Sequence, residues 1–560
     1  MRHNFSLSQS IVASLFIAML PMLAHAQASS TIIHPAFKEL VFLGSSRLLV
    51  PSGVPGNAMG IHQQGLPSLG TPRFVKNMSI FLGRPVTAAN LNEISQATEA
   101  WYRSKGRPFL SVAIPPQNIS NGIVQVVVTQ YTIADVKIVG NKWFSSRLIR
   151  QESGFTAGQQ LALSDVEANM NRLNDNDFRS VNAVFSPGLS PGTTDITLQT
   201  KDRFPLRVYS TYDNQGAPTL GRGEWGVGVV WGNGFGLDQT VSYQFTRSDS
   251  GDYRAHAVSW AAPLPWHDKI VIFGSYSTER PSSDYGDFDS TGHSSQASIR
   301  YVHNFQSIKL GHNISLNTDL QTGYDFKATN NNLAFGGIEI FKGSAEIDQF
   351  PIIFDATEID STGQTIFQNE LDLSPGNLTS GNSNKSFQKL VPGSNASYYL
   401  DHIGLTRTFF FPAHFVWISN VQAQFTNHNL MSSDQLSLGG MYSVRGYYSS
   451  TASGSLGVIT QNEIRTPPFS LIGLSGFKSD FIPSDKDQLG LFFDYGHVSQ
   501  VRSISGGVNE ADLSSAGIDF HMTIKRYITL ASDLGWRLRD APVYGGKGHA
   551  FADVSLTVGF

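Results

Sequence analysis

The last ten residues of the chain, 551–560, read FADVSLTVGF and alternate between two faces. One face is apolar and consists of Ala552, Val554, Leu556, Val558 and Phe560, whereas the other face is small or polar. A strand of about ten residues with this period is typical of a barrel wall that has lipid on one side and a polar lumen on the other. These residues alone leave one alternative open, an ordinary amphipathic edge strand.

The first 26 residues predict an export signal. Arg2 precedes the apolar stretch at residues 11–20, and Ala24-His25-Ala26 has the small-x-small pattern of a signal-peptidase site. The apolar stretch is short for a membrane-spanning helix and Pro21 follows it, so we expect the signal peptide, residues 1–26, to be cleaved. A location in the membrane then has to be reached with strands. A soluble secreted protein stays open as the alternative.

The composition suits an exported barrel and argues against several other classes of protein. The chain has 53 Gly, 37 Phe and 18 Tyr, as expected for many strands with tight turns and aromatic membrane interfaces. It has no Cys, which excludes disulfides, thiol nucleophiles and cysteine metal sites. A net charge of -4 without a long basic run argues against nucleic acid as a partner.

Motifs of enzymes are missing from the sequence. It contains no nucleophile elbow, zinc-protease motif, P-loop or dinucleotide fingerprint. The histidines are scattered, and we expect His402 and His414 to lie at barrel rims rather than around a metal ion. The chain is therefore expected to have no catalytic residues, no cofactor and no bound metal.

A change of period near residue 203 divides the chain. Between residues 37 and 202 the order strand, helix, helix, strand, strand occurs twice, which predicts two small α+β units at 37–130 and 131–202. In the first unit, the Gly- and Pro-rich stretch 51–72 is expected to be a mobile loop. In the second unit, Ser164 is expected to begin a helix through a capping box.

Residues 203–560 predict an all-β, sixteen-stranded antiparallel transmembrane barrel. An even number of strands lets a single chain close its barrel with both ends on the periplasmic side. The polar segments 280–293, 347–363, 374–392 and 428–453 are expected to be extracellular loops. The expected strands are residues 204–214, 222–232, 237–247, 252–262, 268–279, 294–304, 313–325, 333–346, 364–373, 393–404, 415–427, 454–466, 488–498, 512–523, 527–538 and 550–560.

Two motifs in this half predict an ion pair inside the barrel. The long connection at about 428–453 contains the tetrad Val444, Arg445, Gly446 and Tyr447, and a later strand contains Phe492, Asp494 and Gly496. A guanidinium enclosed in a lumen needs a carboxylate, which its planar fork can bind at two points. The two glycines permit a sharp turn and a close approach of loop to wall. The alternative is an exposed loop arginine and an unrelated strand aspartate.

These motifs resemble those of the Omp85 and two-partner-secretion superfamily. There, a long loop with a VRGY or VRGF tetrad folds back into the barrel, and its arginine meets the aspartate of an FxDxG motif; Arg445 and Asp494 are the matching positions. Phe560 resembles the C-terminal aromatic signal by which outer-membrane barrels are handed to the insertion machinery. Two POTRA-type units before sixteen strands look closest to the TpsB group, the haemolysin secretion and activation proteins.

The resemblance implies an outer-membrane pore with periplasmic POTRA domains. It would export a large unfolded exoprotein (a haemolysin, adhesin or contact-dependent toxin) that carries an N-terminal secretion domain, by two-partner (type Vb) secretion. Further implied partners are the barrel insertion machinery and the lipid bilayer. The POTRA strands at 109–114 and 180–186 are candidate edges for pairing with the cargo. An Omp85-type assembly factor is the alternative function, and a passive porin does not require the two periplasmic units.

One departure from these relatives concerns the start of the mature chain. TpsB proteins commonly carry a plug helix and a linker before the first POTRA domain. Residues 27–36 are too few for both, so a plug from this source is not expected.

Overall fold

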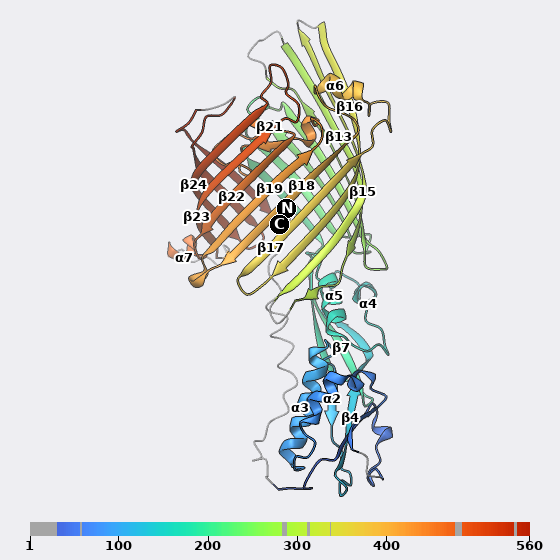
Figure 1. Cartoon of the computed structure of the whole chain (residues 1–560). Coiled ribbons are helices and arrows are strands. Elements are labelled where there is room, and N and C mark those ends of the chain that lie inside the picture. Colours follow the sequence, from blue (N-terminus) through green and yellow to red (C-terminus); the bar gives the residue numbers. More distant parts are fainter. Residues whose placement is uncertain are drawn as a thin grey trace. The chain divides into compact units, whose positions relative to one another are not determined.

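The computed structural model describes residues 31–55, 59–282, 288–310, 314–335, 338–475, 484–542 and 546–560. The expected signal peptide lies outside the described residues. The chain consists of two compact units, Met1–Phe204 and Pro205–Phe560, whose ribbons are drawn in Figure 1. Among the described helices, none is long and apolar enough to cross a membrane.

The first unit opens with a four-stranded sheet in the order β2-β1-β4-β3. Its elements are β1 (Glu39–Leu43), η1 (Ser46–Leu48), β2 (Gly60–Gln64), η2 (Pro67–Gly70), α2 (Pro72–Ser79), α3 (Ala88–Ser104), β3 (Leu110–Ala113) and β4 (Ile123–Gln130). Helix α3 begins where the Thr87 hydroxyl accepts a hydrogen bond from the Asn90 N–H at 3.2 Å, as the sequence predicted. The rings of Phe42, Phe74 and Trp101 pack in the core between the sheet and the two helices.

The stretch 51–72 differs from its prediction as a mobile loop. Outside its undescribed residues 56–58, it contains β2, which runs parallel to β1, and η2. Leu66 and Leu69 are buried in the core, and the Gln63 side chain accepts a hydrogen bond from the Leu66 N–H at 2.8 Å. The Gly and Pro residues of this stretch favoured a loop in the sequence, but the two buried leucines fix the segment in the core.

The second sheet of this unit has the order β5-β7-β6. Its elements are β5 (Thr132–Val139), α4 (Ser146–Ser153), α5 (Leu163–Leu173), β6 (Arg179–Pro187) and β7 (Thr193–Asp202). Ser164 does not cap α5, because the helix starts at Leu163 after Ala162 and has no side-chain cap. The Leu163 N–H instead donates to the Gly106 carbonyl at 2.8 Å, which fixes the entry into the helix one residue earlier.

The second unit is a closed antiparallel barrel, and the predicted fold class is confirmed. In the described residues, sixteen long strands follow one another in chain order, and β26 pairs with β8 to close the ring. These strands are β8 (Leu206–Asp213), β9 (Glu224–Gly234), β10 (Gln239–Ser248), β11 (Tyr253–Pro263), β12 (Lys269–Glu279), β13 (Phe288–Asn304), β15 (Ser315–Phe335), β16 (Ile338–Ile359), β17 (Gly363–Ser374), β18 (Tyr398–Phe410), β19 (Val416–Thr426), β22 (Leu456–Arg465), β23 (Lys486–Ser499), β24 (Glu510–Ile524), β25 (Ile528–Arg537) and β26 (Ala550–Gly559). The short β14 (Ile308–Lys309) pairs with β15.

Side chains alternate between the two faces of the wall. On β23, Leu491 and Phe493 expose 66% and 48% of their surface, whereas Phe492 and Asp494 between and beside them are buried. Exposed apolar residues on one face and enclosed residues on the other match a wall between lipid and lumen.

The predicted extracellular loop at 347–363 is wrong. Strand β16 continues to Ile359, and only a short turn joins it to β17. In this turn the Asp360 carboxylate accepts hydrogen bonds from the N–H groups of Thr362 and Gly363 at 2.6 and 2.9 Å, and hydrogen bonds from Thr362 and then Arg407 lower the pKa of Asp360 to about 2. Residues 347–359 form the half of β16 next to this turn, and Phe350, Ile352 and Phe354 are 43%, 43% and 37% exposed on its outward face. The inward residues Pro351 and Ile353 are apolar as well, so the alternation that marks a strand is hidden in the sequence.

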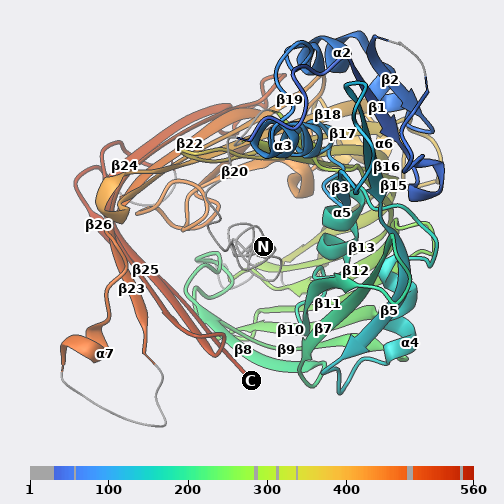
Figure 2. The same ribbon diagram turned by 90° about the horizontal axis from the view of Figure 1, so that it is seen from below.

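The predicted loop at 280–293 is also shorter than expected, because β13 already begins at Phe288. Other connections carry short elements: α6 (Asn384–Leu390), η3 (Pro412–His414) and α7 (Leu471–Leu474). The connection between β19 and β22, residues 427–455, lies within the ring of strands in Figure 2. We call it the lumen loop. It contains η4 (Ser432–Asp434) and the antiparallel pair β20 (Leu436–Leu438) and β21 (Ala452–Gly454).

Candidate functional site

The lumen loop turns sharply shortly before its tetrad. Gly439 and Gly440 have φ angles of +103° and +87°, which favour glycine. A Cβ on Gly439 would lie 2.1 Å from the Tyr448 carbonyl oxygen, so a larger residue does not fit there. The Gly440 N–H donates to the Tyr447 carbonyl at 2.9 Å, which closes residues 440–447 into a compact turn.

The structure brings Arg445 and Asp494 together inside the barrel. The Arg445 Nε lies 2.8 Å from Asp494 Oδ2, and Nη2 lies 2.9 Å from Oδ1, so the pair is bidentate. The backbone N–H of Arg445 also donates to Oδ2 at 3.1 Å. Asp494 is fully buried and Arg445 is 5% exposed. Charge-assisted bonds of this kind fix the orientation of both groups as well as their separation.

A second carboxylate, Glu463, completes the surroundings of the guanidinium. Its Oε2 accepts from Arg445 Nη1 at 2.7 Å, and its other oxygen pairs with Arg465 on the same strand. The Phe492 ring lies under the guanidinium, with its centroid 3.7 Å from Cζ. The sequence prediction included Phe492 but missed Glu463. Glu463 could have been found from its place on the inward face of β22, because it lies directly opposite Phe492 in the strand register.

Two glycines let the backbone of the tetrad contact the backbone of the barrel wall directly. Gly446 has φ +84°, and a Cβ there would lie 2.7 Å from the Gly535 carbonyl oxygen on β25. A Cβ on Gly535 would in turn lie 2.7 Å from the Gly446 Cα. Arg537 Nε donates to the Gly446 carbonyl at 2.7 Å. Gly535 was not predicted, because the sequence around a single glycine in a strand does not indicate which segment packs against it.

The other predicted motif residues also join loop to wall. Val444 is buried, and a Cβ on Gly496 would lie 2.9 Å from its Cγ2. The Tyr447 hydroxyl lies 2.9 Å from the Ser514 carbonyl oxygen and 2.8 Å from that of Arg539. The tetrad therefore contacts β22, β23, β24 and β25.

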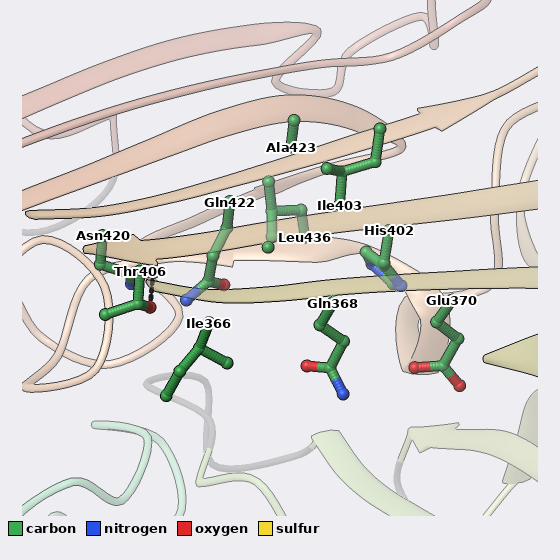
Figure 3. A pocket seen from close by; sticks show the side chains of 11 residues that line it. Ile366, Gln368, Glu370, His402, Ile403, Thr406, Asn420, Gln422, Ala423 and Leu436 are labelled. Carbon is green, nitrogen blue, oxygen red and sulfur yellow. Dashed lines mark hydrogen bonds between the residues drawn. The ribbon is translucent and has the colours of Figure 1, made fainter. Parts of the chain in front are cut away.

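A cavity of about 410 Å³ lies beside the lumen loop, along the inner wall of β17, β18 and β19. Figure 3 shows its polar side chains on three adjacent strands. Within the described part of the chain, Gln368 and Gln422 make no hydrogen bond through their side-chain amides. His402 lines this cavity and contacts Gln424, so its predicted place at a barrel rim is wrong. His414 lies in the turn η3, at the end of β18.

One cluster in this region has side chains of metal-binding type. Oxygen and nitrogen atoms of Glu463, Asp519 and His521 lie within 4.8 Å of one another. Glu463 already pairs with two guanidiniums, which oppose a further cation. His521 lies 3.1 Å from an Asp519 oxygen, which is the distance of an ordinary ion pair.

The C-terminal residue follows directly after β26. The Phe560 N–H donates to the Val208 carbonyl on β8 at 3.0 Å, across the seam that closes the barrel. The Phe560 side chain is 77% exposed and its ring lies 6.4 Å from that of Tyr527.

Residues 192–520 match the family model described as "Haemolysin secretion/activation protein ShlB/FhaC/HecB". The chain belongs to this family. Residues 59–130 match "POTRA domain, ShlB-type", and residues 131–202 match "Surface antigen variable number repeat", a POTRA model.

Named relatives agree with this family. "Heme/hemopexin transporter protein HuxB" of Haemophilus influenzae is 23% identical over 454 residues, which cover 78% of this chain and 75% of the relative. "Outer membrane transporter CdiB" of Escherichia coli O6:K15:H31 is 23% identical over 451 residues, 73% of this chain and 71% of the relative. The solved structure "CdiB from Escherichia coli" has the same fold, with a TM-score of 0.74 at 18% identity over 97% of this chain and 94% of that one.

This member of the haemolysin secretion/activation family is a two-partner secretion transporter of the outer membrane, with its POTRA domains in the periplasm and a large exoprotein as its partner. The predicted family, function and location are confirmed, and the assembly-factor alternative is not supported.

Proposed function

We propose that the lumen loop is the gate of this transporter and that the exoprotein passes along the barrel wall when the loop yields. The buried pair of Arg445 and Asp494 carries this proposal, because it fixes a loop of the chain inside its own pore. Breaking a buried ion pair from one side costs about 3–5 kcal/mol. A loop held in this way stays in place until a partner supplies comparable binding energy. The protein acts as a pore, without an enzymatic step.

The inner wall of β17, β18 and β19 provides a surface for an unfolded chain. The cavity there is lined by apolar side chains and by polar ones that include Glu370 and the amides of Gln368 and Gln422, and these two amides have hydrogen-bonding capacity to spare. An extended polypeptide offers one donor and one acceptor per residue. Amides can satisfy these groups in turn without binding any single sequence tightly, which suits passage of a long substrate.

The POTRA domains receive the exoprotein at their sheet edges. Strand β3 is the outer strand of the order β2-β1-β4-β3, and β6 is an outer strand of β5-β7-β6. Strand β3 lies within the candidate segment 109–114, and β6 contains the candidate segment 180–186. An outer strand has unpaired main-chain groups along one side, and an extended segment of cargo can add to it by β-augmentation.

We assign residues 1–26 to a signal peptide, 37–130 and 131–202 to the two POTRA domains, and 203–560 to the barrel. Phe560 serves as the signal to the insertion machinery, since its exposed ring at the closing seam is available to a partner during folding.

A cross-linking experiment tests the proposed path. A photoreactive amino acid is placed at Gln368 or Gln422 in the full-length protein, in cells that secrete its cognate exoprotein. We expect adducts with the exoprotein while it is in transit. Leu405, which is 43% exposed on the outward face of β18, is the matched control and should give none. Secretion without adducts at the two glutamines would contradict a path along this wall.

A further inference from the structure

A second buried carboxylate holds the lumen loop at a place far from the tetrad in the barrel order. Asp434 ends η4, and β20 lies between it and Arg445 in the sequence. Its side chain is completely buried, although it belongs to a connection rather than to a strand. A buried charge is stable only when it is paired and hydrogen-bonded.

The contacts of Asp434 come from four strands. Its Oδ1 accepts from Lys327 Nζ on β15 at 2.9 Å. Its Oδ2 accepts from the Tyr398 hydroxyl on β18 at 2.8 Å and from Gln349 Nε2 on β16 at 3.0 Å. Its backbone carbonyl accepts from Gln424 Nε2 on β19 at 3.2 Å. Three donors therefore satisfy one carboxylate, and a fourth fixes the backbone beside it.

These contacts share no strand with those of the tetrad. The tetrad is bound by β22, β23, β24 and β25, and Asp434 by β15, β16, β18 and β19. The lumen loop is thus tied to two separate parts of the wall. Loss of one set of contacts leaves every bond of the other intact.

The charges around Lys327 allow Asp434 to be removed without leaving Lys327 unpaired in the wall. Asp325 on the same strand is already paired with Arg300, at 2.5 and 2.8 Å. Asp372 is buried and close enough to act on the charge of Lys327. If Asp434 is removed, Lys327 still has a carboxylate nearby, so the wall keeps a counter-charge while the loop loses its contact.

We propose that Asp434 is a second, independent anchor of the lumen loop, and that opening the pore requires release of both Asp434 and Arg445. Asp434 is a positioning residue that acts through the loop. The inference rests on the proposed gating role of the loop, but the anchoring itself can be measured without cargo.

Spin-label distances in the purified full-length protein test this anchor. The natural chain has no Cys, so introduced cysteines are the only labelled sites. Ser433→Cys reports on the segment beside Asp434, Tyr442→Cys reports on the turn that carries the tetrad, and Leu405→Cys on the outer wall is the common reference. We expect Asp434→Ala to broaden the 433–405 distance distribution about twofold and to leave the 442–405 distribution unchanged. Arg445→Ala should have the reverse effect.

Two further variants distinguish anchoring from general damage. Ser432→Ala, an exposed neighbour, is the matched control and should change neither distribution. Asp434→Asn keeps an accepting oxygen for Tyr398 and Gln349 but loses the charge opposite Lys327, so it should broaden the 433–405 distribution less than Asp434→Ala does. Each variant is first checked for a folded barrel by its heat-dependent migration on a gel.

Two results would overturn the proposal. If Asp434→Ala in a folded barrel leaves the 433–405 distribution narrow, Asp434 is not an anchor. If it broadens both distributions as Arg445→Ala does, the loop has one cooperative attachment instead of two. Neither result depends on secretion, so a failure of the proposed gating role appears separately, as normal export by a variant whose loop is released.

Discussion

A single methyl group on the barrel wall is predicted to loosen the lumen loop. Gly535→Ala places a Cβ 2.7 Å from both the Cα and the N of Gly446, and 2.9 Å from the carbonyl carbon of Arg445. Carbon atoms in contact are normally about 3.5–4.0 Å apart. The atoms that would have to move are backbone atoms, so a side-chain rotation cannot relieve the clash. The loop has to shift by roughly 1 Å at the residue next to its buried guanidinium.

The expected cost of this substitution is that of overpacking, about 1–3 kcal/mol. At about 1.4 kcal/mol for each factor of ten, the detached population of the loop should rise roughly five- to 150-fold. The assay is the 442–405 spin-label distance together with the amount of exoprotein released per inserted barrel. We expect a broader distance distribution and reduced release.

Gly292→Ala on β13 is the matched control, because a Cβ there would meet its nearest atom at 3.6 Å, an ordinary contact. Both variants replace a strand glycine of the same barrel by alanine. If Gly535→Ala behaves like Gly292→Ala in both measurements, the close packing of the tetrad against β25 does not hold the loop.

Three further predictions concern other contacts. Glu463→Gln should reduce release less than Asp494→Asn does, because the bidentate pair of the tetrad survives it; equal losses in a secretion assay would contradict this order. Tyr447→Phe removes a hydroxyl that bonds two segments of the wall and should weaken loop docking by about 0.5–1.5 kcal/mol, seen as a broader 442–405 distribution; an unchanged width would show that the ring alone suffices. Proline at Val112 or Val184 should lower binding of the exoprotein's N-terminal domain to the full-length protein, with circular dichroism as the folding control; undiminished binding to both folded variants would exclude these edges.

The wall of the barrel could be predicted from the sequence because its alternation has a fixed period. Once the inward face of a strand is known, every second residue follows. In residues 551–560, Ala552 was therefore assigned to the outward face, and the neighbouring Asp553 is buried on the inward face. The same rule failed where both faces of a strand carry apolar residues. In β16, Phe350, Ile352 and Phe354 face outward and Pro351 and Ile353 face inward, so no alternation is visible in the sequence.

Contacts across the lumen were harder to predict than the wall. Arg445 and Asp494 were paired through two motifs whose residues could be recognised together. Glu463, Gly535 and Asp434 have no such motif, and their roles depend on which strands face one another once the barrel closes. The alternation of side chains along one strand does not indicate which residue of a distant loop will contact that strand.

Export of the exoprotein by Arg445 variants shows whether the buried ion pair of the lumen loop serves secretion. Wild type, Arg445→Ala and Arg445→Lys are compared in cells that make the cognate exoprotein, and release is divided by the amount of heat-modifiable barrel in the outer membrane. We expect loss of release with Arg445→Ala at normal barrel levels, and an intermediate value with Arg445→Lys, which keeps the charge but lacks the planar fork. Full release by Arg445→Ala at wild-type barrel levels would contradict the claim that the buried ion pair of the lumen loop serves export.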